Sequence, residues 1–184
     1  MRITNLECLH ANAGFRNFDF LKITTDEGLV GWSEYNESFG GVGVTSVVRN
    51  LAPAVVGEDP RAYERIVAKL FAIRRQAAGG IAQQAIGAIE NALLDVKAKA
   101  LGIPVYVMLG GPVRDRIRLY WSHCGTYNLS FAEPMQIPPV RSLADVVELG
   151  RQAKSCGYTA LKTNILRFDV DPPHVHAPGL WRAS

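Results

Sequence analysis

The side chains best suited to chemistry lie at the end of an apolar segment in the last third of the chain. Lys162 and Asn164 close the segment 158–164, which has the composition of a buried strand. A lysine there can act electrostatically while charged, or as a base where neighbouring cations lower its pKa. Asparagine cannot take up a proton at neutral pH, but its amide can hydrogen-bond an oxygen atom. The alternative for Lys162 is a solvated lysine at a strand end.

Four other polar side chains in the last third of the chain are candidates for chemistry. Ser122 falls at the end of the preceding apolar segment, 117–124, where it can meet a ligand or bond the backbone, whereas His123 alternates to the other face and is interpreted as structural. His174 and His176 have the spacing of a metal pair. Because they lie in a proline-rich segment, 171–179, a solvated loop is the favoured interpretation.

Composition excludes several classes of protein. Of 184 residues, 48% are hydrophobic and 20% charged, which is typical of a globular domain. The net charge of +3 comes from scattered basic residues, so we expect no nucleic-acid partner. Apolar stretches break well before the ~20 residues of a membrane span, and the start lacks a secretory apolar region. Three cysteines without CxxC spacing indicate reduced thiols and a cytoplasmic protein.

The first third of the sequence predicts a small antiparallel sheet. Segments 18–24 and 29–35 are rich in aromatic and β-branched residues and are joined by the turn Thr25-Asp26-Glu27-Gly28. Residues 2–9 predict a third strand, and residues 11–17 a connecting loop.

Helices are predicted next. A short one spans 42–51, and Asp59-Pro60 begins a second. The strongest covers 81–101 and ends at Gly102. Its apolar stripe comprises Ala82, Ile86, Ile89, Leu93, Val96 and Ala100.

The last third predicts a strand, a helix and a second strand. The helix begins at Ser142, three residues before Asp145 in the pattern of a capping box, and Gly157 ends it. This order is typical of a βαβ unit, whose two strands are parallel neighbours. A parallel pair with both faces bare is not stable alone, so we expect the sheet to be incomplete.

A longer motif identifies a family resemblance. The run Ala92-Leu93-Leu94-Asp95-Val96-Lys97-Ala98-Lys99, followed by Gly102-Ile103-Pro104 and Gly110-Gly111, resembles a signature of the mandelate racemase and muconate lactonizing enzyme group of the enolase superfamily. Gly31-Trp32-Ser33-Glu34 is similar to its N-terminal capping domain. Arg114-Asp115-Arg116-Ile117 is similar to the entry into the first barrel strand.

The resemblance implies an architecture in two parts. Residues 1–112 would form an α+β capping domain, and residues 113–184 the first βα units of an incomplete (β/α) TIM-type barrel. A whole barrel takes about 250 residues. We therefore expect this chain to be the front part of an enzyme and to be inactive alone. A non-catalytic remnant that persists as an interaction fragment is the alternative.

The resemblance also implies a reaction. Members of the group remove the proton α to a carboxylate, and Mg²⁺ stabilises the resulting enediolate. Lys162 matches the first lysine of a Lys-x-Lys motif beside the substrate carboxylate, and Ser122 matches a serine that contacts that carboxylate. Asn164 replaces the second lysine, which resembles sugar-acid dehydratases of the galactonate dehydratase type. A racemase, epimerase or cycloisomerase is the alternative.

The remaining expectations concern specificity, the metal and partners. Two cap loops, 11–17 and 36–43, would contact the substrate, with Arg16 pairing with its oxygens and Phe39 excluding water. Each residue has an alternative interpretation as loop surface. The three carboxylates that hold the metal in the group have no counterparts here, so the ligands would be absent from this chain. We expect a small sugar-acid carboxylate as substrate, and a homo-oligomer.

Overall fold

The computed structural model describes residues 1–38, 41–77 and 79–177. Contacts divide the chain into two compact units, Met1–Val113 and Arg114–Ser184. Each unit is described by itself below. None of the helices in the described ranges is long and apolar enough to cross a membrane.

The first unit is built on a three-stranded antiparallel sheet in the order β1 (Ile3–Asn12), β2 (Asn17–Thr25) and β3 (Val30–Tyr35). The predicted hairpin and third strand are confirmed. Pairing of β1 with β2 continues to Asn12 opposite Asn17. The connecting loop is therefore shorter than predicted, because cross-strand hydrogen bonds satisfy backbone groups that a loop would leave to water.

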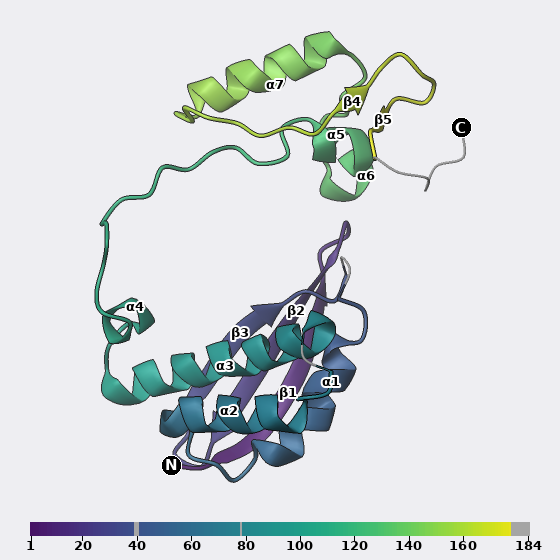
Figure 1. Ribbon diagram of the computed structural model, residues 1–184. Coiled ribbons are helices and arrows are strands. Elements are labelled where there is room, and N and C mark those ends of the chain that lie inside the picture. Colours follow the sequence, from purple (N-terminus) through teal and green to yellow (C-terminus); the bar gives the residue numbers. More distant parts are fainter. Residues whose placement is uncertain (39–40, 78, 178–184) are drawn as a thin grey trace. The chain divides into compact units, whose positions relative to one another are not determined.

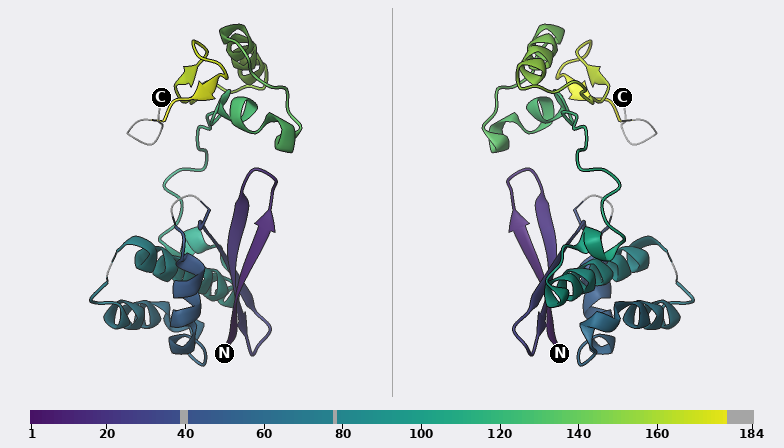
Figure 2. Two further views of the ribbon diagram at one scale, coloured as in Figure 1. Left: turned by 90° about the vertical axis from the view of Figure 1, so that its right-hand side faces the viewer. Right: turned by 90° about the vertical axis from the view of Figure 1, so that its left-hand side faces the viewer.

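Helices cover one face of this sheet as a second layer, and the tip of the β1–β2 hairpin extends beyond them (Figures 1 and 2). The buried core lies between the two layers and draws on every second residue of β2, such as Leu21 and Ile23. The helical elements are α1 (Val44–Leu51), η1 (Ala52–Ala54), η2 (Pro60–Ala62), α2 (Tyr63–Ile73), α3 (Gly80–Leu101) and α4 (Val105–Met108).

Helix α3 forms where its apolar stripe predicts it. Five of the six stripe positions are buried, and Ala100 is half-buried. Gly102 ends the helix with a φ of 68°, a left-handed conformation that glycine adopts without steric cost, and its N–H bonds the carbonyls of Ala98 and Lys99. Asp59 caps η2 rather than α2 directly, since its carboxylate accepts from the Arg61 N–H at 3.0 Å.

Strand β3 and helix α3 form an interlock, which is a set of close contacts between residues 30–33 and helix positions 88–99. A Cβ on Gly31 would lie 2.2 Å from the Ala92 carbonyl oxygen, so only glycine permits this approach. The Ser33 hydroxyl donates to the Ala88 carbonyl at 2.7 Å.

The outer edge of β3 is satisfied by side chains of α3. Asp95 accepts from the Trp32 N–H at 2.8 Å, and the Lys99 ammonium donates to the Val30 carbonyl at 2.8 Å. Asp95 and Lys99 also form an ion pair at 2.7 Å. Three residues of the run 92–99, namely Ala92, Asp95 and Lys99, therefore hold the helix against the sheet.

The second unit departs from the prediction. The elements are α5 (Thr126–Ser130), α6 (Ala132–Met135), α7 (Leu143–Ser155), β4 (Leu166–Arg167) and β5 (His174–Val175). The capping box of Ser142 and Asp145 at the start of α7 is confirmed. Prediction of a plain loop over 171–179 is wrong for His174 and Val175, which pair with Arg167 and Leu166 in a short antiparallel ladder.

The two predicted strands at 117–124 and 158–164 are also wrong as full strands. They meet at one parallel bridge, Trp121 with Leu161. The physical reason is lack of cover, since Ile117, Leu119 and Leu161 are 73%, 67% and 47% exposed. With no further strand beside them in the described residues, little apolar burial offsets the entropy cost of holding the chain extended.

Candidate active site

The parallel bridge brings the two candidate segments of the second unit side by side. The Trp121 N–H donates to the Ala160 carbonyl at 3.0 Å, and the Lys162 N–H donates to the Trp121 carbonyl at 2.8 Å. The Cys124 N–H donates in turn to the Lys162 carbonyl at 2.8 Å. Ser122 and Lys162 each follow a bridged residue by one position, so the structure places the two predicted residues at the same level of two neighbouring segments.

Lys162 contacts a residue that the sequence analysis did not single out. Its ammonium donates to the Tyr120 hydroxyl at 3.5 Å and lies 5.4 Å from the centre of the Tyr120 ring. Both side chains are exposed. The sequence could have identified Tyr120 as a candidate by its spacing. It stands two residues before Ser122, and alternation puts such residues on one face of a strand.

Ser122 and His123 lie in a turn rather than a strand. The Ser122 side chain is exposed, as a ligand-contacting hydroxyl would have to be. The His123 ring stacks on Tyr127, with ring centres 4.8 Å apart and planes at 19°, and its backbone has a φ of 55°. This packing accords with a structural role for His123.

Asn164 follows Thr163, whose side chain links the two segments by a hydrogen bond. The Thr163 hydroxyl donates to the Cys124 carbonyl at 2.7 Å, and Asn164 beside it is exposed.

Burial raises the pKa of the Cys124 thiol, which keeps it protonated. All three cysteines, Cys8, Cys124 and Cys156, are unpaired.

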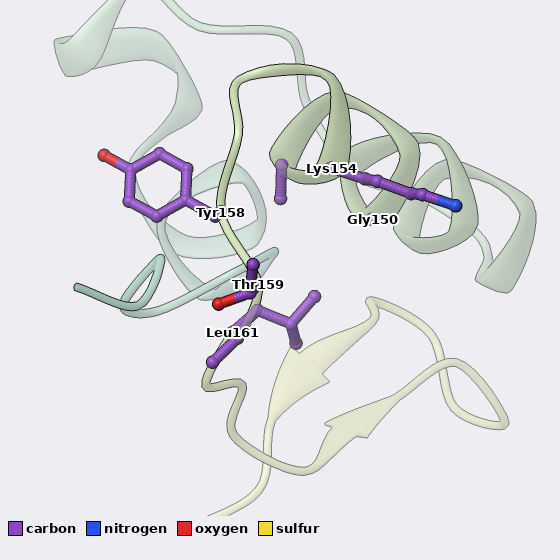
Figure 3. Close-up of a pocket in the computed structure, with 7 residues that line it drawn as sticks. Gly150, Lys154, Tyr158, Thr159 and Leu161 are labelled. Carbon is purple, nitrogen blue, oxygen red and sulfur yellow. The ribbon is translucent and has the colours of Figure 1, made fainter. Parts of the chain in front are cut away.

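A hollow of about 480 Å³ lies between α7 and the segment that follows it (Figure 3). It is lined by Gly150, Ala153 and Lys154 of α7 and by residues 158–161. Tyr158 and Lys154 extend to opposite sides in Figure 3. Neither Lys162 nor Asn164 lines the hollow, so it is separate from the candidate active site.

Arg16 lies at the tip of the hairpin in the first unit. Its guanidinium stacks on Phe18, with Cζ 3.8 Å from the ring centre, and one amine nitrogen is 3.4 Å from the Glu34 carboxylate. The side chain is 25% exposed. Arg16 is therefore held by its own sheet while part of it faces solvent. The other predicted cap residue, Phe39, lies outside the described residues.

The described residues do not fit a magnesium site. They contain no group of three or more His, Cys, Asp or Glu side chains placed to hold a metal ion. Asp169 bonds Arg167 through both oxygens at 2.6 Å, and this contact lowers the pKa of Asp169 to about 2. The His174 Nδ1 lies 3.4 Å from the Pro172 carbonyl, and the His176 N–H bonds the Ile165 carbonyl at 2.8 Å.

Comparison with known proteins identifies the family of this chain. Residues 11–110 match the family model for the N-terminal domain of mandelate racemase / muconate lactonizing enzyme. The chain belongs to this family of the enolase superfamily. The first unit thus contains the N-terminal domain of this family, and the contacts of β3 with α3 lie within the matched residues.

Curated relatives include D-galactonate dehydratases. That of Xanthomonas axonopodis pv. citri (strain 306) is 42% identical over 120 residues, which are 65% of this chain and 31% of the relative. That of Verminephrobacter eiseniae (strain EF01-2) is 36% identical over 145 residues, which are 79% of this chain and 34% of the relative. The chain thus spans about a third of the length of these relatives.

Solved structures give a similar result. A provisionally assigned L-alanine-DL-glutamate epimerase from Burkholderia xenovorans strain LB400 is 43% identical, with a TM-score of 0.91 over 96% of this chain and 44% of that one. A second structure from the same source is bound to magnesium and fumarate, with a TM-score of 0.90.

Proposed function

We propose that this chain is the N-terminal part of an enzyme that removes the proton α to a carboxylate and dehydrates a sugar acid. The observation that carries the proposal is the placement of Lys162 and Asn164 directly after a parallel bridge. Groups at the carboxyl ends of parallel barrel strands form the active sites of such folds. The identity with D-galactonate dehydratases supports the choice of a sugar acid.

Each residue has a defined task in this proposal. The Lys162 ammonium lies beside the substrate carboxylate and offsets the negative charge that develops when the α proton leaves. Its contact with Tyr120 orients it. Asn164 donates a hydrogen bond to a substrate oxygen, and Ser122 bonds the carboxylate. Loss of the α proton and the β hydroxyl releases water and gives an enol, which becomes a 2-keto-3-deoxy acid.

Magnesium enters only as part of the complete enzyme. Bound there, it would stabilise the enediolate as a Lewis acid. We assign its ligands to residues that this chain does not supply, and none of the tasks above depends on it.

Epimerisation is the second candidate, and the Burkholderia relative favours it. Inversion at a carbon needs an acid and a base on opposite faces of the substrate. An amide at position 164 cannot act as a base at neutral pH. Epimerisation would therefore require that the second proton carrier come from elsewhere in the protein.

A chimera separates the two candidates. Residues 1–165 of this chain replace the aligned segment of the Burkholderia protein, which supplies the remaining residues. The chimera is incubated with magnesium and a panel of sugar acids, and products are followed by mass spectrometry. We expect loss of one water from at least one sugar acid. Exchange of the α proton with solvent deuterium, without loss of water, would favour the epimerase. The 184-residue chain alone serves as the inactive reference.

A further inference from the structure

A buried carboxylate lies inside the sheet of the first unit. Asp19 on β2 is 2% exposed, and its two oxygens have different partners. One lies 2.7 Å from Nδ1 of His10, directly across on β1. The other accepts from the backbone N–H of Glu37 at 2.8 Å. A buried charge is tolerated only where such partners compensate for its lost hydration. The chain after β3 must therefore keep the Glu37 N–H beside Asp19.

Glu37 extends the connection to helix α1. Its carboxylate accepts from the backbone N–H groups of Gly43, at 2.8 Å, and of Thr45, at 3.1 Å, and from the Thr45 hydroxyl. Burial opposes ionisation of Glu37, but these hydrogen bonds outweigh it and lower its pKa. The Thr45 hydroxyl also lies 2.8 Å from the Tyr35 hydroxyl on β3.

Two described residues of this region, Asn36 and Gly41, approach each other closely. A Cβ on Gly41 would lie 2.1 Å from the Asn36 carbonyl oxygen, so the two ends of this segment touch. The Ser38 hydroxyl donates to the Asn17 carbonyl at 3.3 Å, a second and more exposed link to the hairpin. The hairpin and the segment are thus joined by the hydrogen bond through the buried Asp19 and by the more exposed one through Ser38.

We infer that Asp19 is a positioning residue that holds the tip of the β1–β2 hairpin, residues 13–16, and the segment 36–38 as one unit with the start of α1. Under the proposed function, both segments belong to loops that determine substrate specificity. Specificity would then depend on Asp19, although Asp19 itself is buried in the cap. The inference rests on the proposed function for that consequence alone, and the coupling itself is a property of this chain.

Substitutions at position 19 can keep or remove the contacts of its side chain. An asparagine can accept from the Glu37 N–H with its oxygen and turn its amide group toward Nδ1 of His10. A threonine has a shorter side chain with a single oxygen, so it cannot keep both contacts.

Amide hydrogen exchange of the 184-residue chain, measured by NMR, tests the inference. In Asp19→Ala we expect exchange at Gly43 and Thr45 to accelerate at least tenfold, although neither amide bonds Asp19. Exchange at Ala13, within the hairpin tip, should accelerate too. Ser38→Ala is the matched control and should leave Gly43 and Thr45 within about twofold of the original chain. Acceleration confined to the Glu37 amide would overturn the inference.

Asp19→Thr and Asp19→Asn cover the case in which the alanine variant does not fold. Exchange at Gly43 and Thr45 should accelerate at least tenfold in Asp19→Thr and stay within about threefold of the original chain in Asp19→Asn. Equal rates in the two variants would refute the coupling through Asp19. No substrate is present, so failure of the sugar-acid assay leaves this result unaffected, and the reverse also holds.

Discussion

Gly31 on β3 lies so close to Ala92 on α3 that the structure has no room for a methyl group between them. A Cβ at position 31 would also come within 2.4 Å of a Val96 methyl carbon. The neighbouring atoms are helix backbone and a β-branched side chain, both of which are stiff. This contact sets the distance between the two layers of the first unit.

Substitution of Gly31 by alanine should therefore destabilise the first unit. We expect a loss of about 3 kcal/mol in the free energy of unfolding, at the upper end of overpacking costs. Urea unfolding followed by circular dichroism measures it. Gly87→Ala on α3 is the control: a Cβ there meets nothing within 4 Å, and alanine favours a helix, so stability should rise by up to about 1 kcal/mol. Equal stability of the two variants would contradict the argument.

Asp95 should prove structural rather than catalytic. Its carboxylate accepts from the Trp32 N–H and pairs with Lys99, so Asp95→Ala leaves an N–H of the strand edge unpaired. We expect a loss of about 1 kcal/mol. In the chimera, turnover of the sugar acid per folded molecule should stay unchanged. A large fall in turnover with unchanged stability would place Asp95 in the site instead.

Lys162 and Asn164 should govern turnover without governing stability. Both are exposed, so Lys162→Ala in the chimera is expected to lower the rate of dehydration about 10²- to 10³-fold while the unfolding curve stays in place. Lys154→Ala, a lysine of the separate hollow, is the matched control and should keep full activity. Asn164→Lys should reduce dehydration at least about tenfold. Unchanged dehydration by that variant would remove Asn164 from the mechanism.

Acid should weaken the capping of η2 in a defined pH range. The Arg61 side chain lowers the pKa of Asp59 to about 2, below its ordinary value of 3.8. A group whose pKa is lower in the folded chain stabilises the fold above its unfolded pKa, and that stabilisation is lost as pH falls through the folded pKa. Part of the acid sensitivity between about pH 4 and pH 2 should therefore disappear in Arg61→Gln. Thermal unfolding at several pH values gives this comparison. The same pH dependence in both chains would refute the assignment.

The first unit was predictable because its signals are local. Alternation in β2, the stripe of α3 and the stop at Gly102 each act within a few residues, and all three appear in the structure. The buried cluster around Asp19 was missed, since it joins residues of β1, β2 and the segment after β3 that nothing in the sequence pairs.

The second unit was predicted less well for a different reason. Segments 117–124 and 158–164 have strand composition, but parallel strands depend on neighbours that are distant in sequence. In the structure the two segments align at Trp121 and Leu161, but they do not form strands of the predicted length. Positions of Lys162 and Ser122 at one level were therefore predictable, whereas their contacts, such as that of Lys162 with Tyr120, were not.

The interlock of β3 with α3 also restricts how this sequence can change in length. Four helix positions, 88, 92, 95 and 99, meet residues 30–33 through a carbonyl, a close backbone approach, a carboxylate and an ammonium. One inserted residue turns the helix beyond it by about 100°, given 3.6 residues per turn. No such rotation can restore four contacts of different chemistry. Insertions and deletions between residues 88 and 99 are therefore expected to be far less tolerated than substitutions on the exposed side of the same helix.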